Sequence, residues 1–330
     1  MVQQTETMAR THVPVVKARQ RRVQEIALGY AMLAPALLLL VVFEFYPIFY
    51  GLYISLCNWR LGCNSFVGAA NFTRALHDPE MWHSLWITTV YALLSVPLQL
   101  GLGLFLAYLL FQKIRYKPFF RTVFFLPYVT SSVASAAVWS YLYSPDRGPL
   151  NALLGALGFQ PRNWLGEPLG IFTLIAQSLG LTLPSWAGGP SLALVSIVIY
   201  TTWVFVGYAI TIFLAGLGTI PPELYDAAKV DGASGWVQFR YVTLPLLSPT
   251  TFFLLIFTVI GTFKAFNHIY VMTQGGPYNE TTTASIFIFR QLFESNRYGY
   301  SAALSFILFF CILLLTIFQN RVVGRRVNYD

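Results

Sequence analysis

The residues Pro221–Pro245, PPELYDAAKVDGASGWVQFRYVTLP, form the one long polar interruption between two strongly apolar blocks of the chain. Pro221 and Pro222 suit the start of a helix, because the missing N–H of proline costs nothing in the first turn. Glu223 and Asp226 follow, where carboxylates complement the positive end of the helix dipole. The stretch therefore predicts a short helix that begins at these prolines.

The end of this helix and the start of a second one are also marked in the sequence. Gly232 can end the first helix in the left-handed backbone conformation, which is strained for residues with a Cβ atom. Ser234 can cap a second short helix that runs through Phe239 and Tyr241, and Pro245 then stops it. We therefore expect a compact helix–turn–helix, although by shape alone an ordinary amphipathic loop fits equally well.

The composition places this loop in an integral membrane protein. Of the 330 residues, 56% are hydrophobic and only 10% are charged, against about 25% charged residues in an ordinary soluble domain. Such a chain cannot cover its apolar surface with its own polar groups, so membrane lipid must cover it. The chemistry of an ordinary soluble globular domain is thereby excluded.

Six apolar runs are long enough to cross the membrane, since a helix needs roughly 20 residues to span the hydrocarbon core. The sequence therefore predicts an all-α protein with six transmembrane helices and both termini on the same side. The predicted spans lie near residues 28–50, 87–110, 122–143, 191–215, 249–271 and 300–319.

The distribution of Lys and Arg predicts which side is cytoplasmic. These residues concentrate in the segments that a cytoplasmic N-terminus would place inside: the basic segment 1–27, the connection 111–121, the loop 221–245 and the tail 321–330. This bias follows the positive-inside rule. It also accounts for the net charge of +8 without nucleic acid as a partner.

The loop 144–190 is the ambiguous part of this topology. Its apolar stretch at residues 171–183 is short and is interrupted by Gln177, Ser178 and Gly180. It fits an interfacial or re-entrant helix better than a seventh span, which would place the two termini on opposite faces.

The three cysteines match no metal-ligand spacing. Cys57 and Cys63 fall in one external loop, where a disulfide and two free thiols both remain open. Cys311 lies in an apolar run and is expected to pack there.

The polar loop carries a recognisable pattern. Asp226-Ala227-Ala228, then Asp231-Gly232-Ala233, then Phe239 and Leu244-Pro245, resembles the EAA loop of the membrane subunits of ABC importers. The first position in that family is usually Glu, where this chain has Asp226. Further matches lie at Trp203, at residues 213–217 and at residues 275–277, so the resemblance to carbohydrate permeases of the maltose-importer class covers roughly residues 28–320. Against that pattern, residues 170–190 look like an insertion.

The resemblance implies a type I ABC importer (MetI-like) permease fold in the cytoplasmic, or inner, membrane of a prokaryote. A second homologous permease subunit would complete the pore. Two ATPase subunits would bind ATP and Mg, and an extracytoplasmic solute-binding protein would deliver a sugar. The resemblance assigns ATPase coupling to Leu224, Asp226, Ala227, Ala228, Asp231, Gly232, Ala233, Phe239 and Pro245.

Polar groups at membrane depth are costly and therefore suggest function. Tyr208 lies nine residues from Leu217, or about 14 Å along a helix, and Thr258 lies at a similar depth in the fifth predicted span. In the resembled family these two helices line the sugar cavity, which makes the following residues candidate substrate contacts: Trp203, Phe205, Tyr208, Thr258, Thr262, Lys264 and Asn267.

Structural roles compete with substrate binding at these positions. A threonine in a span often bonds its own backbone, Tyr208 can bridge helices, and Lys264 can extend its ammonium group toward the interface. Lys264 can instead recognise an anion, which would favour a charged polyol such as glycerol phosphate.

Catalytic chemistry is not indicated by the sequence. The chain has no G-x-x-x-x-G-K-[ST] and no metal-ligand spacing among its four histidines, so we expect no catalytic residue, no metal and no cofactor bound by this chain. An ion-coupled secondary transporter remains an alternative, but it would be expected to show an internal repeat and intramembrane acids. A membrane-embedded enzyme and a structural scaffold are the further alternatives.

Overall fold

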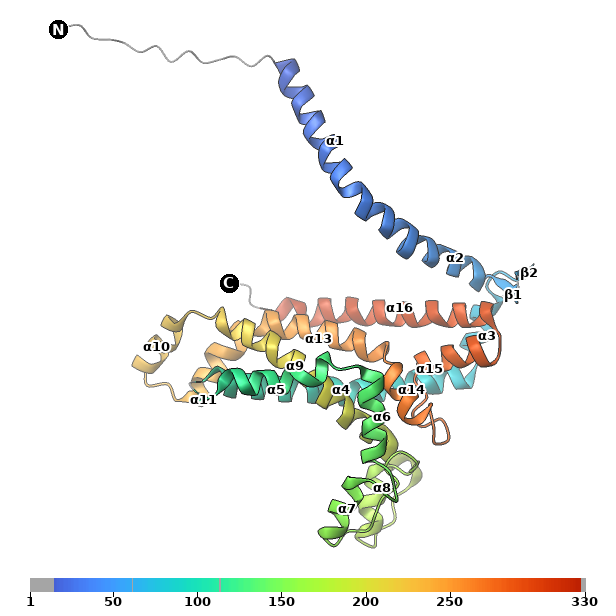
Figure 1. The fold of residues 1–330 in the computed structure, drawn as a ribbon, viewed down its shortest axis with the longest axis vertical. Coiled ribbons are helices and arrows are strands. Elements are labelled where there is room, and N and C mark those ends of the chain that lie inside the picture. Colours follow the sequence, from blue (N-terminus) through green and yellow to red (C-terminus); the bar gives the residue numbers. More distant parts are fainter. Residues whose placement is uncertain (1–14, 61, 113, 328–330) are drawn as a thin grey trace, which may run out of the picture. The chain divides into compact units, whose positions relative to one another are not determined.

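The computed structural model of the protein describes residues 15–60, 62–112 and 114–327 (Figure 1). It divides into two units, residues 1–54 and 55–330. The first unit consists of α1 (Val15–Leu40), the π-helical turn η1 (Val41–Phe45) and most of α2 (Tyr46–Ser55). Together they contain an apolar helix, Gln24–Ser55, of 32 residues. The predicted span 28–50 lies within this helix, and residues 1–14 of the predicted basic segment lie outside the described residues.

The second unit is a helical bundle built on three long apolar helices: α4 (Pro79–Phe111), α9 (Leu192–Gly218) and α16 (Tyr298–Val322). Figure 1 shows α4 and α16 running along the bundle with α13 (Ser248–Phe263) between them. The predicted spans 87–110, 191–215 and 300–319 lie within the three long helices.

Two of these helices begin at capping residues. The Asp78 side chain accepts a hydrogen bond from the Glu80 amide at 2.9 Å, and Pro79 occupies the first turn of α4. Ser191 caps α9 by accepting from the Leu194 amide at 3.2 Å. Both arrangements satisfy amides that a helix N-terminus otherwise leaves without partners.

Small residues allow α4 and α9 to pack closely. A Cβ atom at Gly103 of α4 would lie 2.7 Å from the Cβ of Ala209 of α9. Close backbone approach through small residues is a common basis of helix association in membranes. The polar groups of the two helices are consequently brought within reach of one cavity.

The predicted span 122–143 is not one straight helix. The segment forms two helices, α5 (Lys117–Val129) and α6 (Ser132–Leu142), which are bent by 98°. Thr130 is extended, with ψ of 155°, and its hydroxyl donates to the Pro127 carbonyl at 2.7 Å. Ser131 then caps α6 by accepting from the Ala134 amide at 3.4 Å. Local capping therefore breaks a segment whose composition alone suits a straight span.

The predicted span 249–271 also needs correction. Helix α13 ends at Phe263, residues 264–266 are not helical, and a short helix α14 (Asn267–Thr273) follows. A break at this point frees backbone groups, which a protein tolerates where they line a cavity or pack inside it.

The expectation that Pro245 stops the second helix of the polar loop is wrong as well. Helix α11 (Gly235–Gln238) continues into the π-helical turn η3 (Phe239–Thr243) and α12 (Leu244–Leu246), which includes Pro245. Residues 235–246 and α13 are bent by 64°. Pro245 lies in the first turn of α12, where proline is tolerated. The described residues thus contain four long apolar helices, or up to six spans if each bent pair counts as one.

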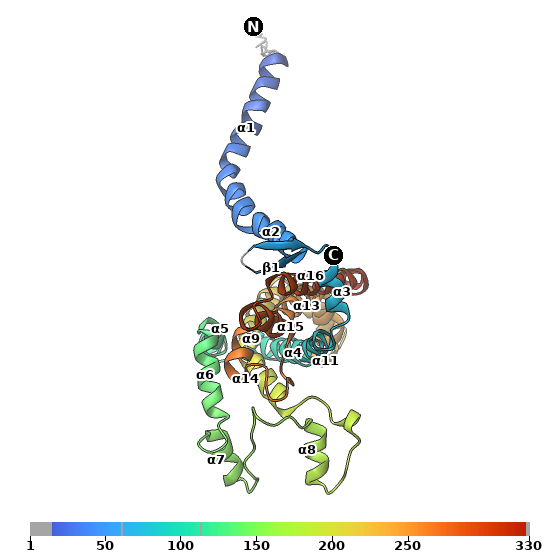
Figure 2. The same ribbon diagram turned by 90° about the vertical axis from the view of Figure 1, so that its right-hand side faces the viewer.

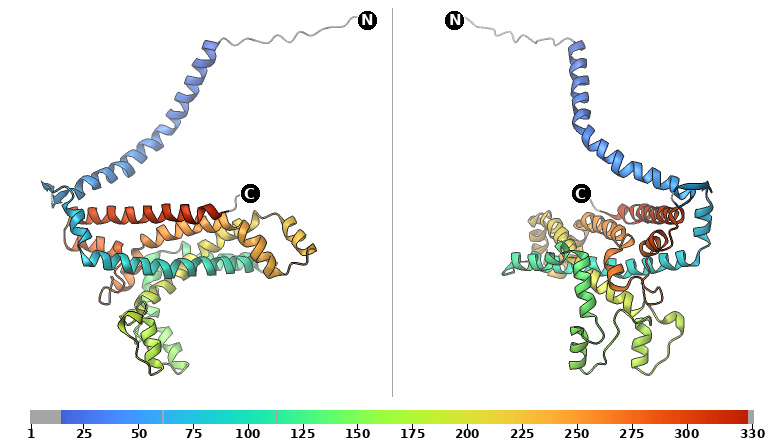
Figure 3. Two further views of the ribbon diagram at one scale, coloured as in Figure 1. Left: turned by 180° about the vertical axis from the view of Figure 1, so that it is seen from behind. Right: turned by 45° about the vertical axis from the view of Figure 1, so that its right-hand side comes forward.

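The loop 144–190 contains only short helices: α7 (Pro149–Ala156), α8 (Ile171–Ser178) and the 3-10 turn η2 (Ser185–Ala187). Helix α8 has 8 residues, too few to span a membrane. Gly170 pairs with Ser191 in an isolated antiparallel β-bridge, and the Ile171 amide donates to the Pro190 carbonyl at 2.9 Å. The two ends of segment 170–190 thus meet, as an insertion requires. Figures 2 and 3 show α7 and α8 in a lobe that projects from the bundle.

A small hairpin lies at the start of the second unit. Strands β1 (Cys57–Trp59) and β2 (Cys63–Phe66) pair antiparallel, and Cys57 and Cys63 form a disulfide, which decides the alternative that the sequence leaves open. The remaining elements are α3 (Ala70–Leu76), α10 (Pro222–Val230), α15 (Ala284–Phe289), η4 (Arg290–Glu294) and η5 (Gly324–Arg326).

Candidate coupling loop and substrate cavity

Helix α10 begins and ends as its sequence predicts. Pro221 precedes the helix and Pro222 occupies its first turn. Gly232 has φ of +76°, its amide donates to the Lys229 carbonyl at 3.0 Å, and the Ala233 amide donates to the Ala228 carbonyl at 2.9 Å. This pair of bonds defines a Schellman motif, which satisfies carbonyls that the helix end would otherwise expose. The direction of the chain after α10 is therefore fixed by Gly232.

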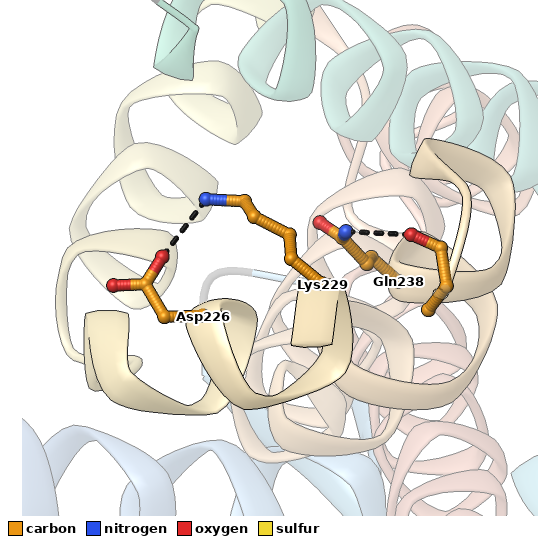
Figure 4. A network of polar contacts seen from close by, with 4 residues as sticks. Asp226, Lys229 and Gln238 are labelled. Atoms are coloured by element: carbon orange, nitrogen blue, oxygen red, sulfur yellow. Dashed lines mark hydrogen bonds and ion pairs between the residues drawn. The ribbon is translucent and has the colours of Figure 1, made fainter. Parts of the chain in front are cut away.

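Further hydrogen bonds hold the rest of the loop. The Gln238 Nε2 atom donates to the Ala233 carbonyl at 2.9 Å, and Lys229 Nζ lies 2.9 Å from Asp226 Oδ1 (Figure 4). The hydroxyls of Tyr225 and Thr243 lie 3.1 Å apart and join α10 to η3. The loop is consequently a defined unit and not an irregular connection.

The predicted coupling residues divide into a surface and an anchor. Phe239 is partly buried, with its ring 4.8 Å from that of Tyr108 on α4, so it fixes the loop to the bundle. The partly buried members are Ala228, Ala233, Phe239 and Pro245, and the exposed ones are Leu224, Asp226, Ala227, Asp231 and Gly232.

The loop also exposes large apolar side chains that the sequence-based assignment left out. Val230 is 89% exposed, Trp236 70% and Tyr241 73%. Exposed apolar surface of this kind marks contact with another protein or with the membrane. These side chains lie in the same loop as the exposed EAA positions, so the loop presents an apolar surface for such a contact.

A cavity of about 220 Å³ lies among α4, α9, α13 and the residues that follow α13. It brings together six of the seven predicted substrate contacts: Phe205, Tyr208, Thr258, Thr262, Lys264 and Asn267. Trp203 is not among its lining residues. The Trp203 ring instead packs 5.4 Å from Trp139 and 6.3 Å from Tyr200.

Aromatic and polar side chains both line the cavity. The Tyr208 ring stacks 5.0 Å from Tyr128 and lies 5.1 Å from Phe257. On α13, the Thr262 hydroxyl donates to the backbone carbonyls of Thr258 and Val259 at 3.0 and 2.9 Å, so it is occupied within its own helix. The Thr258 hydroxyl makes no hydrogen bond to another described residue.

Helix α4 contributes lining residues that the sequence-based selection missed. Gln99 is 3% exposed, and its Nε2 atom has no hydrogen-bond partner among the described residues. A buried amide donor without a partner is costly, unless a ligand supplies an acceptor. Gln99 lies inside the predicted span 87–110, so its polarity at membrane depth was a usable signal. The other missed lining residues include Tyr91, Ser132, Thr201, Phe257 and His268.

A buried polar triangle forms one rim of the cavity. The Tyr91 hydroxyl lies 2.9 Å from Thr201 Oγ1 and 3.0 Å from His268 Nε2, and the last two atoms are 3.2 Å apart. These side chains join α4, α9 and α14. The triangle therefore holds α14 in place after the non-helical residues 264–266.

The arrangement suits a polyhydroxylated ligand. Aromatic faces cover apolar ring surfaces, and amide and hydroxyl groups bond ligand hydroxyls. Within residues 15–60, 62–112 and 114–327, no three His, Cys, Asp or Glu side chains are placed to hold a metal ion. Lys264 is the one cationic side chain among the described lining residues.

Comparisons with known proteins agree with this architecture. Residues 99–328 match the family described as "Binding-protein-dependent transport system inner membrane component". The lactose transport system permease protein LacF of Rhizobium radiobacter is 35% identical over 295 residues, which cover 88% of this chain and 92% of that protein. The sn-glycerol-3-phosphate transport system permease protein UgpA of Agrobacterium fabrum is 34% identical over 306 residues, covering 92% and 96%.

A solved structure gives the same fold. A chain of a bacterial alginate ABC transporter, in complex with an alginate pentasaccharide-bound periplasmic protein, aligns with a TM-score of 0.76 at 21% identity. The alignment covers 92% of this chain and 96% of that chain.

Proposed function

Because the chain belongs to the family of binding-protein-dependent inner-membrane transport components, we propose that it is the permease subunit of an ATP-driven sugar importer. It forms half of the translocation pore in a prokaryotic inner membrane. A second permease subunit supplies the other half, and an extracytoplasmic binding protein delivers a mono-, di- or oligosaccharide. Relatives named for lactose and glycerol-3-phosphate transport support this class of substrate.

The observation that carries the proposal is the cavity with its unpartnered Gln99 amide. A sugar hydroxyl or ring oxygen would satisfy this buried donor. The aromatic rings around Tyr208 support the same ligand class, because sugar rings present apolar faces to aromatic side chains. Thr258 on α13 and Asn267 on α14 supply further polar groups to the same cavity.

The proposal assigns ATP chemistry to partner subunits. Two ATPase chains bind ATP and Mg, and the exposed surface of α10 and α11 docks on them. Their closure moves α9 and α13 through the loop between these helices, which changes access to the cavity. The chain itself is then a non-catalytic subunit without a bound cofactor.

Gentle purification tests this proposal directly. The tagged chain is solubilised from its native membrane, and the co-purifying proteins are identified by mass spectrometry. We expect a second permease of this family and a P-loop ATPase. Recovery of this chain alone in several mild detergents would contradict the proposal, and uptake that survives ATP depletion but needs an ion gradient would favour a secondary transporter.

Lys264 supports a second candidate substrate, a charged polyol such as glycerol phosphate. Its side chain lines the cavity, and an ammonium group pairs well with phosphate. For an anionic substrate, Lys264→Met should reduce uptake by at least about tenfold, while Lys264→Arg retains most of it. For a neutral sugar, both variants should stay within about threefold of the unmodified protein in uptake assays.

A further inference from the structure

A second cavity is lined by residues of the β1–β2 hairpin, α3 and the start of α16, which lie at the end of the bundle opposite α10 (Figure 1). Its volume is about 530 Å³. Three separate segments form its wall: the hairpin residues 57–60, helix α3, and residues 295–300 at the start of α16. We call it the arginine cavity after Arg60, Arg74 and Arg297, which line it.

The wall of the arginine cavity is held in place by covalent and polar contacts. The disulfide between Cys57 and Cys63 closes the hairpin. The Asn71 Nδ2 atom donates to the carbonyls of Ser55 and Cys57 at 2.8 and 3.1 Å, which ties the hairpin to α3. The hydroxyl of Tyr300 donates to Asp78. The site is therefore formed before any ligand arrives.

The three arginines of this wall are not held in ion pairs among the described residues. Arg74 lies over the Tyr300 ring, with Cζ 4.6 Å from the centroid, and Arg297 donates to the neutral Oε1 atom of Gln291 at 3.3 Å. Asp78, which accepts a hydrogen bond from Tyr300, also caps α4.

Three guanidinium groups around a concave surface attract anions. Cavities lined by one sign of charge concentrate the electric field, and guanidinium groups match the geometry of carboxylates. The described lining contains no aliphatic side chain, and its apolar surface comes from the aromatic residues Trp59, Tyr298 and Tyr300. The cavity is also wide for a single small anion, and it suits an acidic side chain that enters on a protein surface.

We propose that the arginine cavity receives an acidic side chain of the extracytoplasmic binding protein. This inference rests on the proposed function, since it requires such a partner. The charge distribution predicts that this end of the bundle faces outward, and the disulfide fits an oxidising compartment. The cavity then provides an anchor for docking that is separate from the substrate cavity among α4, α9 and α13.

The test measures binding of the ligand-loaded binding protein of the same transport system to the full transporter. The transporter is placed in nanodiscs of phosphatidylcholine, and affinity is measured by biolayer interferometry between low and high salt. The test variant is Arg60→Gln combined with Arg297→Gln. The matched control is Arg147→Gln, which removes an exposed arginine from the α6–α7 connection.

We expect the double variant to weaken binding by at least about tenfold at low salt and to reduce the salt dependence, because two of the three positive charges around the acidic side chain are lost. The control should bind as the unmodified transporter does. Equal affinity and equal salt dependence in the double variant would overturn the inference. Co-purification of the ATPase tests the proposed function separately from the docking role. If the double variant is unstable, the single variant Arg60→Gln is measured in its place.

Two other results would assign the cavity to a different ligand. Unchanged docking with arginine-dependent thermal stabilisation by phosphatidylglycerol nanodiscs would make it a lipid site. Unchanged docking with arginine-dependent stabilisation by inorganic phosphate would make it a site for a free anion. Either result would overturn the proposed docking role.

Discussion

The coupling loop, residues 221–245, and the substrate cavity differ in the kind of group that has no partner within the described chain: apolar side chains in the loop and a polar amide in the cavity. The loop exposes large apolar side chains, such as Trp236 at 70% exposure, whereas the cavity buries a polar amide of Gln99 without a partner. A self-contained protein avoids both situations, because exposed apolar clusters promote association and unpaired buried donors are costly. The difference supports the two proposals made above, a protein partner for the loop and a polar ligand for the cavity.

The largest expected effect comes from Gly232→Pro. Gly232 has φ of +76° and its amide donates to Lys229, whereas proline fixes φ near −65° and has no N–H, which costs about 3 kcal/mol or more where both are needed. The turn after α10 should be lost, so ATP-coupled uptake should fall to background while the chain remains in the membrane. Transport of labelled sugar into vesicles, with immunoblotting for membrane content, measures both.

Gly235→Pro is the matched control for that variant. Gly235 is the first residue of α11, follows the extended Ser234 cap, and has open space where a side chain would begin. Proline is favoured at this position of a helix. Uptake should therefore remain near normal, and equal loss in both variants would show only that the loop tolerates no proline.

The next largest effect is expected from Gln99→Leu in the cavity. If Gln99 bonds the substrate, the apparent affinity for uptake should fall by about tenfold, the value of one hydrogen bond to a buried group. The thermal stability of the ligand-free protein should stay equal or rise, because an unsatisfied donor is removed. Weaker uptake together with a lower melting temperature would contradict a ligand-binding role and indicate a structural one.

Thr89→Val is the control on the same helix. The Thr89 hydroxyl donates to the Leu85 carbonyl at 2.8 Å and does not line the cavity. Its replacement should leave the apparent affinity within about twofold of the unmodified protein.

The two regions also differ in how far the sequence predicts them. The start and end of α10 depend on residues within the helix or next to it, Pro222 and Gly232, so the sequence predicts them well. The cavity depends on contacts between helices far apart in the chain. Phe205 and Tyr208 could be selected from depth along one helix, but the contribution of α4 through Gln99 depends on its packing against α9 at Gly103.

The errors at the broken helices have a related cause. Hydropathy over a 20-residue window does not detect a short break in the helix, and the non-helical residues Thr130 and Ser131 interrupt an otherwise apolar segment. Similarly, Pro245 predicts a helix end, but the helical backbone continues from the π-helical turn η3 through Pro245 to Leu246. Trp203 was chosen for its position on α9, whereas its side chain packs against Trp139 and Tyr200.

A smaller effect should separate the two threonines of α13. Thr258→Val removes a hydroxyl that has no partner among the described residues, and we expect a loss of apparent affinity of about threefold to tenfold. Thr262→Val removes a hydroxyl bonded to its own helix, so uptake should change by less than about twofold. The opposite order in a substrate titration would show that the substrate displaces the intrahelical bond of Thr262.

The smallest effect is expected at Lys229. Its ion pair with Asp226 joins side chains that are 62% and 71% exposed, and exposed pairs contribute little because water and salt screen them. Lys229→Met should therefore shift the melting temperature by no more than about 2 °C. If Lys229 contributes only to stability, uptake by this variant should be nearly normal. If uptake instead falls strongly at unchanged stability, Lys229 must act on a partner outside the chain. Purification of the variant then shows whether the ATPase is still bound. Loss of the ATPase would indicate lost docking, and its retention would indicate that the docked ATPase no longer moves the helices. That result would extend the docking surface from the apolar residues of the loop to its charged face.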